Sequence, residues 1–364
     1  MSLTKNKITN DVNYMVLETN ITKMFGIKHP IVAAPMGPFY TTQLTIAVSE
    51  AGGLGVLSHS ALISDYMAGK NPVQILKDNM LEVVEHTDKP FGFNIRTSRR
   101  EVEAPILVKE IPEFIMSNPK LKEQCVYAIT SAGSSKTLPQ SKAYLKLKES
   151  GSQIKHFHVA PALWLADKCV ASGVDGVVVT GTEGGGHQSY EQVSTLVLLQ
   201  QVMKKHPDLP VIACGGFATG EGLAAALALG AGAVAMGSRF IASEESEFSN
   251  EYKNIPTTSK AQDTILATGA LGPIRLWKNE YSLHHGLVSD KEAKMAEEAQ
   301  MSQADIIKEG KAYEAAYKGD TNSGAVLLGQ SIGLIEDMKK VKVIVEEIVQ
   351  DAEKRLRTAA SYLK

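Results

Sequence analysis

Short apolar, β-branched segments alternate with longer segments of helical periodicity between residues 31 and about 240. This alternation is typical of parallel strands joined by helical crossovers, because a strand buried on both faces reads as a continuous apolar run. Eight strand–helix units favour a closed α/β barrel, the (β/α)8 TIM barrel, over a six-stranded doubly wound sheet. The eight strands are predicted at residues 31–34, 54–58, 91–95, 125–130, 154–159, 176–180, 210–214 and 233–236. The predicted helices between them include 41–51, 72–86, 139–149, 162–171, 191–205 and 220–229.

The composition changes after the eighth predicted strand. Residues 242–322 are charged, polar and largely helical in pattern, whereas residues 324–364 return to apolar periodicity. Such an apolar stripe is expected to pack back onto the barrel. We therefore predict a barrel formed by residues 23–241 and 323–364, with a small helical substrate or lid domain inserted at 242–322.

The charge and composition of the chain disfavour nucleic acid and membranes as partners. The 364 residues carry 38 Lys and Arg against 40 Asp and Glu, a net charge of -2 that offers no basic field for nucleic acid or membranes. Cys125, Cys169 and Cys214 are odd in number and form no metal-binding spacing. Residues 1–22 lack the apolar core of a signal peptide. We expect a cytoplasmic protein that acts on a small molecule, with a homodimer as a possible assembly.

The strand predicted at 176–180 is followed by the sequence GTEGGGH at residues 181–187. Its four glycines let a backbone approach a ligand closely, and Glu183 and His187 are side chains that can transfer protons. Taken alone, this loop is either a structural turn with an incidental histidine or part of a catalytic site.

Glycines also follow the seventh and eighth strands, where barrels of this kind commonly bind a phosphate. Gly215 and Gly216 precede a helix, and Gly237 is followed by Ser238 and Arg239. Ser238 offers a hydroxyl group to a phosphate. Arg239 either adds a positive charge to the phosphate site or points away from it as a structural anchor.

Asn94 lies within the third predicted strand, where asparagine is disfavoured unless it has a hydrogen-bond partner. It could bind the ring of a planar ligand, or it could serve only the hydrogen bonds of the barrel. The chain contains no Walker motif, no GxSxG elbow and no GxGxxG motif at its first strand. These absences disfavour a hydrolase or a Rossmann dehydrogenase.

The remaining histidines of interest are expected to be structural. His156 and His158 face the same side of a strand, but no third ligand stands at a metal-binding spacing, so no metal site is predicted. His158 has apolar neighbours and is expected in the core rather than in catalysis. His59, His284 and His285 are expected to be structural or on the surface.

A set of ordered motifs over about residues 21 to 340 resembles the nitronate monooxygenase (2-nitropropane dioxygenase) family. Flavin-dependent enoyl-ACP reductase and an NAD(P)H:quinone reductase belong to the same superfamily. The matching segments are Ala34-Pro35-Met36, the AGGLG at 51–55, the FGFNI at 91–95, the glycine loop ending at His187, Cys214-Gly215-Gly216, the GEG at 220–222, the GSRF at 237–240 and the GQSIGLI at 329–335.

The resemblance implies an FMN-binding barrel with a small helical domain that closes over the flavin. His187 matches the catalytic histidine of the family and would lie beside the flavin N5, acting on the substrate as a base or as a polarising hydrogen-bond donor. By the same resemblance, the residues expected to contact FMN are Pro35, Met36, Gly37, Asn94, Thr180, Gly185, Gly215, Gly216, Ala235, Met236, Gly237 and Ser238.

Two segments depart from the family pattern. Gly184 stands where many relatives have alanine, and Gln188 and Ser189 follow the histidine. The end of the third strand looks closer to the enoyl reductase branch, and it is followed by the run RTSRR at 96–100. Arg96, Arg99 and Arg100 either form a solvated loop or bind a phosphorylated carrier, a CoA or NADPH.

The sequence thus predicts an FMN-dependent oxidoreductase that oxidises alkyl nitronates with O2. One alternative is an enoyl-ACP, enoyl-CoA or quinone reductase that uses NAD(P)H. A second alternative is a barrel that binds flavin or phosphate without catalysis.

Overall fold

A computed structural model describes residues 17–98, 101–269, 272–284, 292–293, 296, 300 and 302–363. Eight parallel strands form one sheet in the order β1-β9-β8-β6-β5-β4-β3-β2. All eight predicted strands are confirmed. They are β1 (Ile31–Ala33), β2 (Gly55–Leu57), β3 (Phe91–Arg96), β4 (Cys125–Ser131), β5 (Lys155–Ala160), β6 (Gly176–Thr180), β8 (Val211–Cys214) and β9 (Ala233–Met236).

The sheet closes on itself between its first and last strands. Val32 in β1 forms a parallel bridge with Leu54, directly before β2. The Ala33 N–H donates to the Leu54 carbonyl at 2.9 Å, and the Leu54 N–H donates to the Ile31 carbonyl at 2.9 Å. Together with the flanking helices, this closure confirms the predicted TIM barrel.

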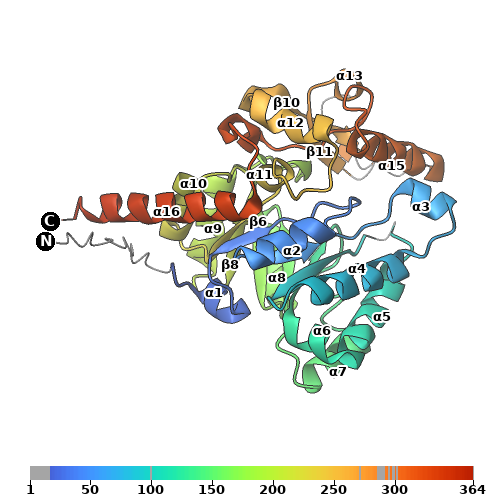
Figure 1. The fold of residues 1–364 in the computed structure, drawn as a ribbon, viewed down its shortest axis with the longest axis horizontal. Helices are drawn as coiled ribbons and strands as arrows, with labels where there is room; N and C mark the ends of the chain where they lie inside the picture. Colours follow the sequence, from blue (N-terminus) through green and yellow to red (C-terminus); the bar gives the residue numbers. More distant parts are fainter. Residues whose placement is uncertain are drawn as a thin grey trace, which may run out of the picture.

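Helices surround the barrel (Figure 1). The six predicted helices are present, and the structure adds α5 (Ala104–Ser117) and α6 (Pro119–Gln124) between β3 and β4. The final helix, α16 (Val341–Ala360), packs against α10 (Gly220–Ala228) and α2 (Thr42–Glu50). Its approach to α10 is so close that a Cβ on Gly220 would lie 2.6 Å from the Ala352 nitrogen. The other helices are α1 (Asn20–Phe25), α3 (Ile63–Met67), α4 (Pro72–His86), α7 (Lys142–Glu149), α8 (Leu163–Ala171), α9 (Thr195–Lys205) and α11 (Ser238–Ile241).

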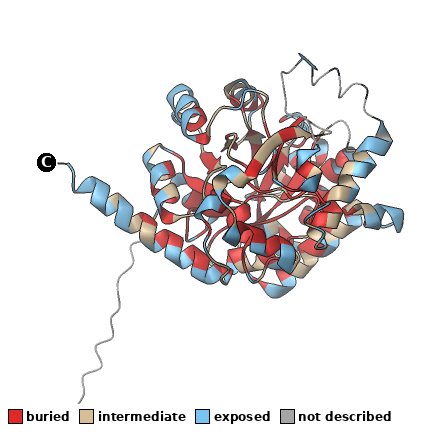
Figure 2. Cartoon of the chain, turned by 90° about the horizontal axis from the view of Figure 1, so that it is seen from above, coloured by how far each residue is buried: buried red, intermediate tan, exposed pale blue. Residues whose placement is uncertain are grey.

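Aromatic side chains fill the end of the barrel where the strands begin. The rings of Phe25, Tyr127 and Phe157 pack with centroids 5.1 to 5.6 Å apart. Glycine is required beside them, because a Cβ on Gly92 would lie 2.6 Å from the Tyr127 ring and a Cβ on Gly176 would lie 2.3 Å from the Phe157 ring. Buried residues run through the centre of the molecule in Figure 2. This end of the barrel is therefore a packed core, and it leaves the opposite end for ligands.

The segment at 242–322 contains helices and also a β-hairpin that the sequence did not predict. The hairpin joins β10 (Thr264–Gly269) to β11 (Gly272–Trp277) in antiparallel register. These elements gather beyond the strand ends, at the top of Figure 1. The other elements of the insertion are α12 (Asn250–Thr258), η1 (Ala261–Asp263), α13 (Glu280–Leu283) and α15 (Gln303–Tyr317), and η2 (Gln330–Leu334) follows it.

An aromatic cluster joins the insertion to the barrel. Phe39, in the loop after β1, stacks on Tyr317 with ring centroids 5.1 Å apart, and it meets Phe248 edge-on at 5.0 Å. The Tyr252 hydroxyl accepts a hydrogen bond from the Leu327 N–H at 2.7 Å. The loop after β1 and the insertion therefore share one hydrophobic core.

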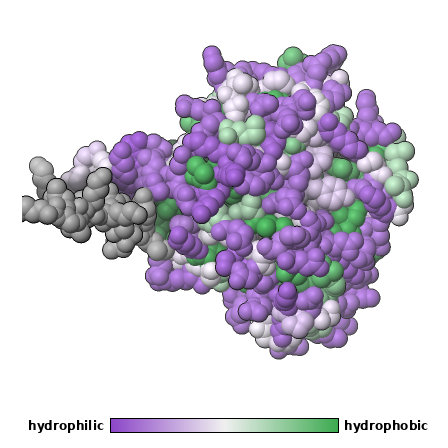
Figure 3. Space-filling model, viewed as in Figure 1, coloured by the Kyte–Doolittle hydropathy of each residue, from purple (hydrophilic) through white to green (hydrophobic). Residues whose placement is uncertain are grey.

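The face of the molecule in Figure 3 is mostly hydrophilic, with apolar residues in small scattered groups. Among the described residues, no helix is both long and apolar enough to span a membrane. Cys125 and Cys169 are buried and Cys214 is half-buried, and all three are free thiols.

His156 and His158 share one partner beneath the helices that cover the barrel. The Thr130 hydroxyl lies 2.7 Å from His156 Nε2 and 2.7 Å from His158 Nδ1. Both histidines are fully buried. Burial lowers the pKa of His156 from 6.5 to about 3 and that of His158 to about 4. Both side chains are therefore neutral in the folded protein near neutral pH.

This burial predicts a stability that decreases in acid. Below about pH 6.5 the two histidines bind protons in the unfolded chain but not in the folded one, so the free energy of unfolding should fall as the pH drops towards about 4. The expected slope is up to about 1.4 kcal/mol per pH unit for each histidine. Urea unfolding at several pH values measures this slope.

The substitutions His156→Gln and His158→Asn keep a polar group near Thr130 and should make the slope shallower. His86→Gln, at an exposed histidine on α4, is the control and should retain the wild-type slope. Equal slopes for all variants would contradict the prediction.

Candidate active site

Most of the predicted ligand-binding residues meet at the carboxyl-terminal mouth of the barrel. Strands β1, β9, β8 and β6 are neighbours in the sheet, and the ends of these strands and the segments that follow them carry eleven of the twelve predicted FMN contacts and His187. Asn94 lies on β3, which is separated from β1 by β2. The mouth of a TIM barrel is where ligands bind, so the sequence placed these residues on the appropriate side of the fold.

The turn after β8 has the geometry of an anion-binding loop. Gly215 and Gly216 have φ values of 88° and 87°, which side chains other than glycine rarely adopt. A Cβ on Gly216 would meet nothing closer than the Glu183 Cβ at 3.5 Å, so the space above this residue is open. The turn leads into α10, where the Thr219 hydroxyl caps the helix by accepting a hydrogen bond from the Gly222 N–H. These features fit a phosphate group.

The residues after β9 divide into a ligand-facing and a structural part. The Ser238 hydroxyl accepts a hydrogen bond from the Gly329 N–H at 3.0 Å, which leaves its own proton to donate. Arg239 is buried and donates to the carbonyl oxygens of Asp337 at 2.7 Å and Ala242 at 2.8 Å. Of the two roles that the sequence left open for Arg239, the structure supports that of an anchor. A Cβ on Gly237 would have no neighbour closer than 3.8 Å, so this turn also has open space beside it.

Asn94 is part of the hydrogen-bonding system of the barrel. Its Nδ2 donates to the Ile129 carbonyl at 3.1 Å and lies 3.4 Å from the Ser131 hydroxyl. Both contacts use the amide nitrogen, so the Oδ1 is the atom that can accept a hydrogen bond from a ligand. In the loop after β1, the Met36 N–H already donates to the Ser58 hydroxyl at 2.7 Å. Any ligand contact of Met36 therefore involves other atoms of this residue.

The glycine loop ends in a two-residue strand, β7 (Gly186–His187), that pairs with β11 of the insertion. Gly186 lies opposite Arg275, and His187 lies opposite Ile274. The Gln188 N–H extends this pairing by donating to the Pro273 carbonyl at 2.7 Å. His187 itself is exposed at the mouth. The insertion thus supplies the strand that holds the candidate catalytic histidine.

Gly185 is required by packing. A Cβ at this position would lie 2.7 Å from the Gly329 nitrogen and 2.7 Å from the Leu328 carbonyl carbon. The returning chain therefore touches the loop directly, and the Gln330 N–H donates to the Glu183 carbonyl at 2.8 Å. A side chain at 185 would push the two segments apart.

Glu183, to which the sequence assigned no role, braces the loop against α9. Its carboxylate accepts a hydrogen bond from the Thr195 N–H at 2.8 Å and lies 3.0 Å from the Thr195 hydroxyl. Thr195 is the first residue of α9, so Glu183 satisfies an N–H at the start of the helix from outside it.

Arg275 is a site residue that the sequence did not reveal. It is buried on β11, and its Nε donates to the Thr182 carbonyl at 2.7 Å. Nothing in the local sequence signals this contact, because the two residues are 93 positions apart and the strand that carries Arg275 was not predicted.

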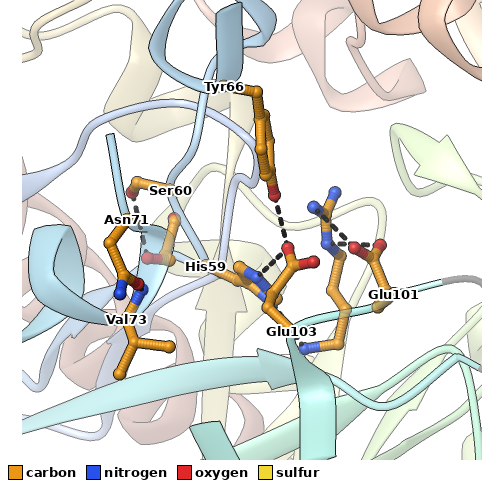
Figure 4. Close-up of polar contacts among 9 residues, drawn as sticks. His59, Ser60, Tyr66, Asn71, Val73, Glu101 and Glu103 are labelled. Carbon is orange, nitrogen blue, oxygen red and sulfur yellow. Dashed lines mark hydrogen bonds and ion pairs between the residues drawn. The ribbon is translucent and has the colours of Figure 1, made fainter. Parts of the chain in front are cut away.

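A separate polar cluster lies at the ends of β2 and β3 (Figure 4). His59 Nε2 lies 3.0 Å from Glu103 Oε1, and its Nδ1 accepts a hydrogen bond from the Arg96 N–H at 3.1 Å. Burial raises the pKa of Glu103, but the hydrogen bonds from His59 and Tyr66 outweigh it and lower the pKa to about 2. His59 is thus structural, as expected.

Ligand-type atoms of His59, Glu101 and Glu103 lie within 4.8 Å of one another, the one such group of three among the described residues. These atoms are already engaged, because Arg96 pairs with Glu101 at 3.0 Å and His59 with Glu103. We assign no metal to this cluster. Arg99, Arg100 and His285 lie outside the described residues. His284 is exposed at the end of α13.

The brace made by Glu183 predicts a loss of stability when it is removed. Glu183→Ala should lower the free energy of unfolding of the flavin-free protein by about 1 kcal/mol, the usual value of a helix N-terminal cap. Urea unfolding measures the change, and Glu191→Ala, at an exposed position between β7 and α9, is the matched control. Equal effects of the two substitutions would show that the brace contributes no stability.

Comparison with known proteins identifies the family. The nitronate monooxygenase family model matches residues 18–351. A "(3aS,4S,5R,7aS)-5-hydroxy-7a-methyl-1-oxo-octahydro-1H-indene-4-carboxyl-CoA dehydrogenase" of Rhodococcus jostii is 31% identical, over 93% of this chain and 97% of its own length. A probable nitronate monooxygenase of Staphylococcus saprophyticus is 28% identical, over 93% of this chain and 98% of its own length.

Solved structures agree with this assignment. FabK from Thermotoga maritima is 32% identical and superimposes with a TM-score of 0.76, covering 95% of this chain and 99% of FabK. A nitroalkane oxidase of Streptomyces ansochromogenes, at 23% identity and a TM-score of 0.70, shares the fold over 93% of this chain and 99% of its own. The family model, the relatives and the barrel with its glycine-lined mouth lead to one conclusion: this chain belongs to the nitronate monooxygenase family and is a flavin-dependent enzyme.

Proposed function

We propose that this protein is an FMN-dependent oxidoreductase that oxidises alkyl nitronates, with O2 as the electron acceptor. The observation that carries the proposal is the position of His187. His187 is exposed at the end of β7, which pairs with β11 of the insertion. The loop that carries it follows β6, and the turn of Gly215 and Gly216 follows the neighbouring strand β8.

The residues at the mouth fit FMN. The open turn at Gly216, the free hydroxyl proton of Ser238 and the open space at Gly237 would hold the phosphate group, and the Asn94 Oδ1 would accept a hydrogen bond from the flavin ring. When bound, FMN supplies the electron transfer that the amino acid side chains cannot perform. The other proposed contacts are Pro35, Met36, Gly37, Thr180, Gly185, Gly215, Ala235 and Met236.

His187 is proposed to act on the substrate through its imidazole ring. As a hydrogen-bond donor it would bind and orient the anionic oxygens of a nitronate, and as a base it could accept a proton from a neutral nitro compound. The segment at 242–322 is proposed to cover the substrate as a lid on the barrel of residues 23–241 and 323–364. The aromatic contact of Phe39 with Tyr317 would keep this segment packed against the loop after β1.

A half-reaction tests the substrate. Under anaerobic conditions, an alkyl nitronate should reduce the bound flavin and bleach its visible absorbance without added NAD(P)H. His187→Ala should slow this bleaching by about 100-fold or more, as expected when a catalytic acid–base group is removed.

The matched control is His86→Gln, which alters an exposed histidine far from the mouth and should leave the rate unchanged. A wild-type rate in His187→Ala would exclude the proposed role of the histidine. A flavin that only NADH or NADPH bleaches would exclude nitronates as the electron donor.

A second candidate substrate class is an acyl thioester. It is favoured by the similarity over nearly the full length to a dehydrogenase of a carboxyl-CoA compound, and by the similarity to FabK, which is also a flavin enzyme. In this reaction His187 would donate a hydrogen bond to the thioester carbonyl, and reduction would require NAD(P)H. Oxidation of the NAD(P)H-reduced enzyme by a crotonyl-type thioester, with no response to nitronates, would support this candidate in place of the first.

A further inference from the structure

The loop that carries His187 is held from two sides. On the barrel side, the Glu183 carboxylate binds the start of α9 through Thr195. On the side of the insertion, Arg275 reaches the loop from β11. The two contacts involve adjacent residues of the loop, because Arg275 binds Thr182 and the next residue is Glu183.

All three nitrogen atoms of the Arg275 guanidinium group take part in these contacts. Its Nε donates to the Thr182 carbonyl at 2.7 Å, and one terminal nitrogen lies 3.4 Å from the Thr182 hydroxyl. The other terminal nitrogen donates to the Thr264 hydroxyl on β10 at 3.0 Å. The side chain is only 7% exposed. Because the guanidinium group is planar and binds both Thr182 on the loop and Thr264 on the hairpin, it fixes the orientation of the loop relative to the hairpin as well as their distance.

The backbone of Arg275 acts on the same loop. Arg275 is paired with Gly186, directly before His187, so one residue binds the loop at both its beginning and its end. A strand of two residues has too few hydrogen bonds to be stable alone. The position of His187 therefore depends on the hairpin that pairs with it.

Charge favours the same arrangement. Burial lowers the pKa of Arg275, and the attraction of Glu183 opposes this effect. The acceptors that Arg275 binds directly are uncharged oxygens of threonine. The carboxylate of Glu183 thus lies where it offsets part of the cost of a buried cation, which links the two contacts.

We propose that Arg275 is a positioning residue for catalysis: the insertion uses its guanidinium group to hold Thr182, and thereby sets the place of His187 at the mouth of the barrel. The proposal rests on the role proposed above for His187. It gives the insertion a part in building the site, in addition to covering it.

Turnover of the FMN-loaded enzyme tests the consequence for catalysis. Arg275→Ala should lower kcat for an alkyl nitronate by about 10- to 100-fold, the usual effect of losing a residue that orients a catalytic group. KM and the dissociation constant of FMN should stay within about twofold, because Arg275 is not proposed to touch either ligand. Arg275→Lys keeps the charge but loses the planar guanidinium group, so it should recover only part of kcat.

Hydrogen exchange tests the geometry without turnover. In the flavin-free protein, peptides that cover residues 182–188 should exchange faster in Arg275→Ala than in the wild type, because the loop loses the side-chain contact that fixes Thr182 and opens more readily. Glu245→Gln is the matched control. Glu245 is also in the insertion and accepts a hydrogen bond from the Val341 N–H at 2.9 Å, at a helix away from the loop. This control should leave exchange at 182–188 and kcat unchanged.

Several results would overturn the proposal. One is unchanged hydrogen exchange at 182–188 in Arg275→Ala, and another is a full recovery of kcat in Arg275→Lys. The others are a rise in KM with unchanged kcat in Arg275→Ala, or a kcat in that variant no lower than in Glu245→Gln. The proposed function is tested separately by the anaerobic reaction of the wild type with a nitronate, and the role of His187 by His187→Ala. If that variant turns over at the wild-type rate, the proposed role of His187 fails, while the exchange data still decide whether Arg275 holds the loop.

Discussion

The closure of the parallel sheet is the constraint on which the rest of this structure depends. Two hydrogen bonds between β1 and Leu54, directly before β2, join the two strands at the ends of the sheet order. Once the sheet is closed, all eight strands end at one mouth, and loops far apart in the sequence are brought together there. The aromatic rings of Phe25, Tyr127 and Phe157 fill the other end, so a ligand has only one end of the barrel to enter.

The insertion extends this arrangement. It is fastened to the barrel by the stacking of Phe39 on Tyr317, and Phe39 belongs to a loop that itself carries proposed FMN contacts. At the same time, β11 supplies the partner strand of His187. The loop proposed to hold the cofactor and the loop of His187 are thus both packed against the same segment. The proposed cofactor site, the proposed lid and His187 consequently belong to one packed unit.

The sequence was sufficient for the barrel and for the place of the site, but not for its internal contacts. Continuous apolar runs identify buried parallel strands, and all eight were found. The helix α5 was not among the predicted helices, and it contains Pro105 near its start and Pro112 within it, which obscure a helical pattern. The hairpin was missed because its two strands of six residues lie in a charged segment that was expected to be helical. The roles of Arg239, Asn94 and Glu183 depend on partners distant in sequence, which periodicity does not report.

The pairing of β7 with β11 has a consequence for how the protein matures. The barrel strands are complete at Met236, yet the partner of His187 begins at Gly272, and the segment that packs on Gly185 lies at Leu328 and Gly329. During synthesis from the N-terminus, the histidine loop is therefore exposed before the chain that fixes it has been made. The barrel strands can pair first, and the site proposed around His187 is completed only when the chain has reached Gly329. A protein truncated within the insertion would keep every predicted barrel strand and still lack the segments that pack on the loop of His187.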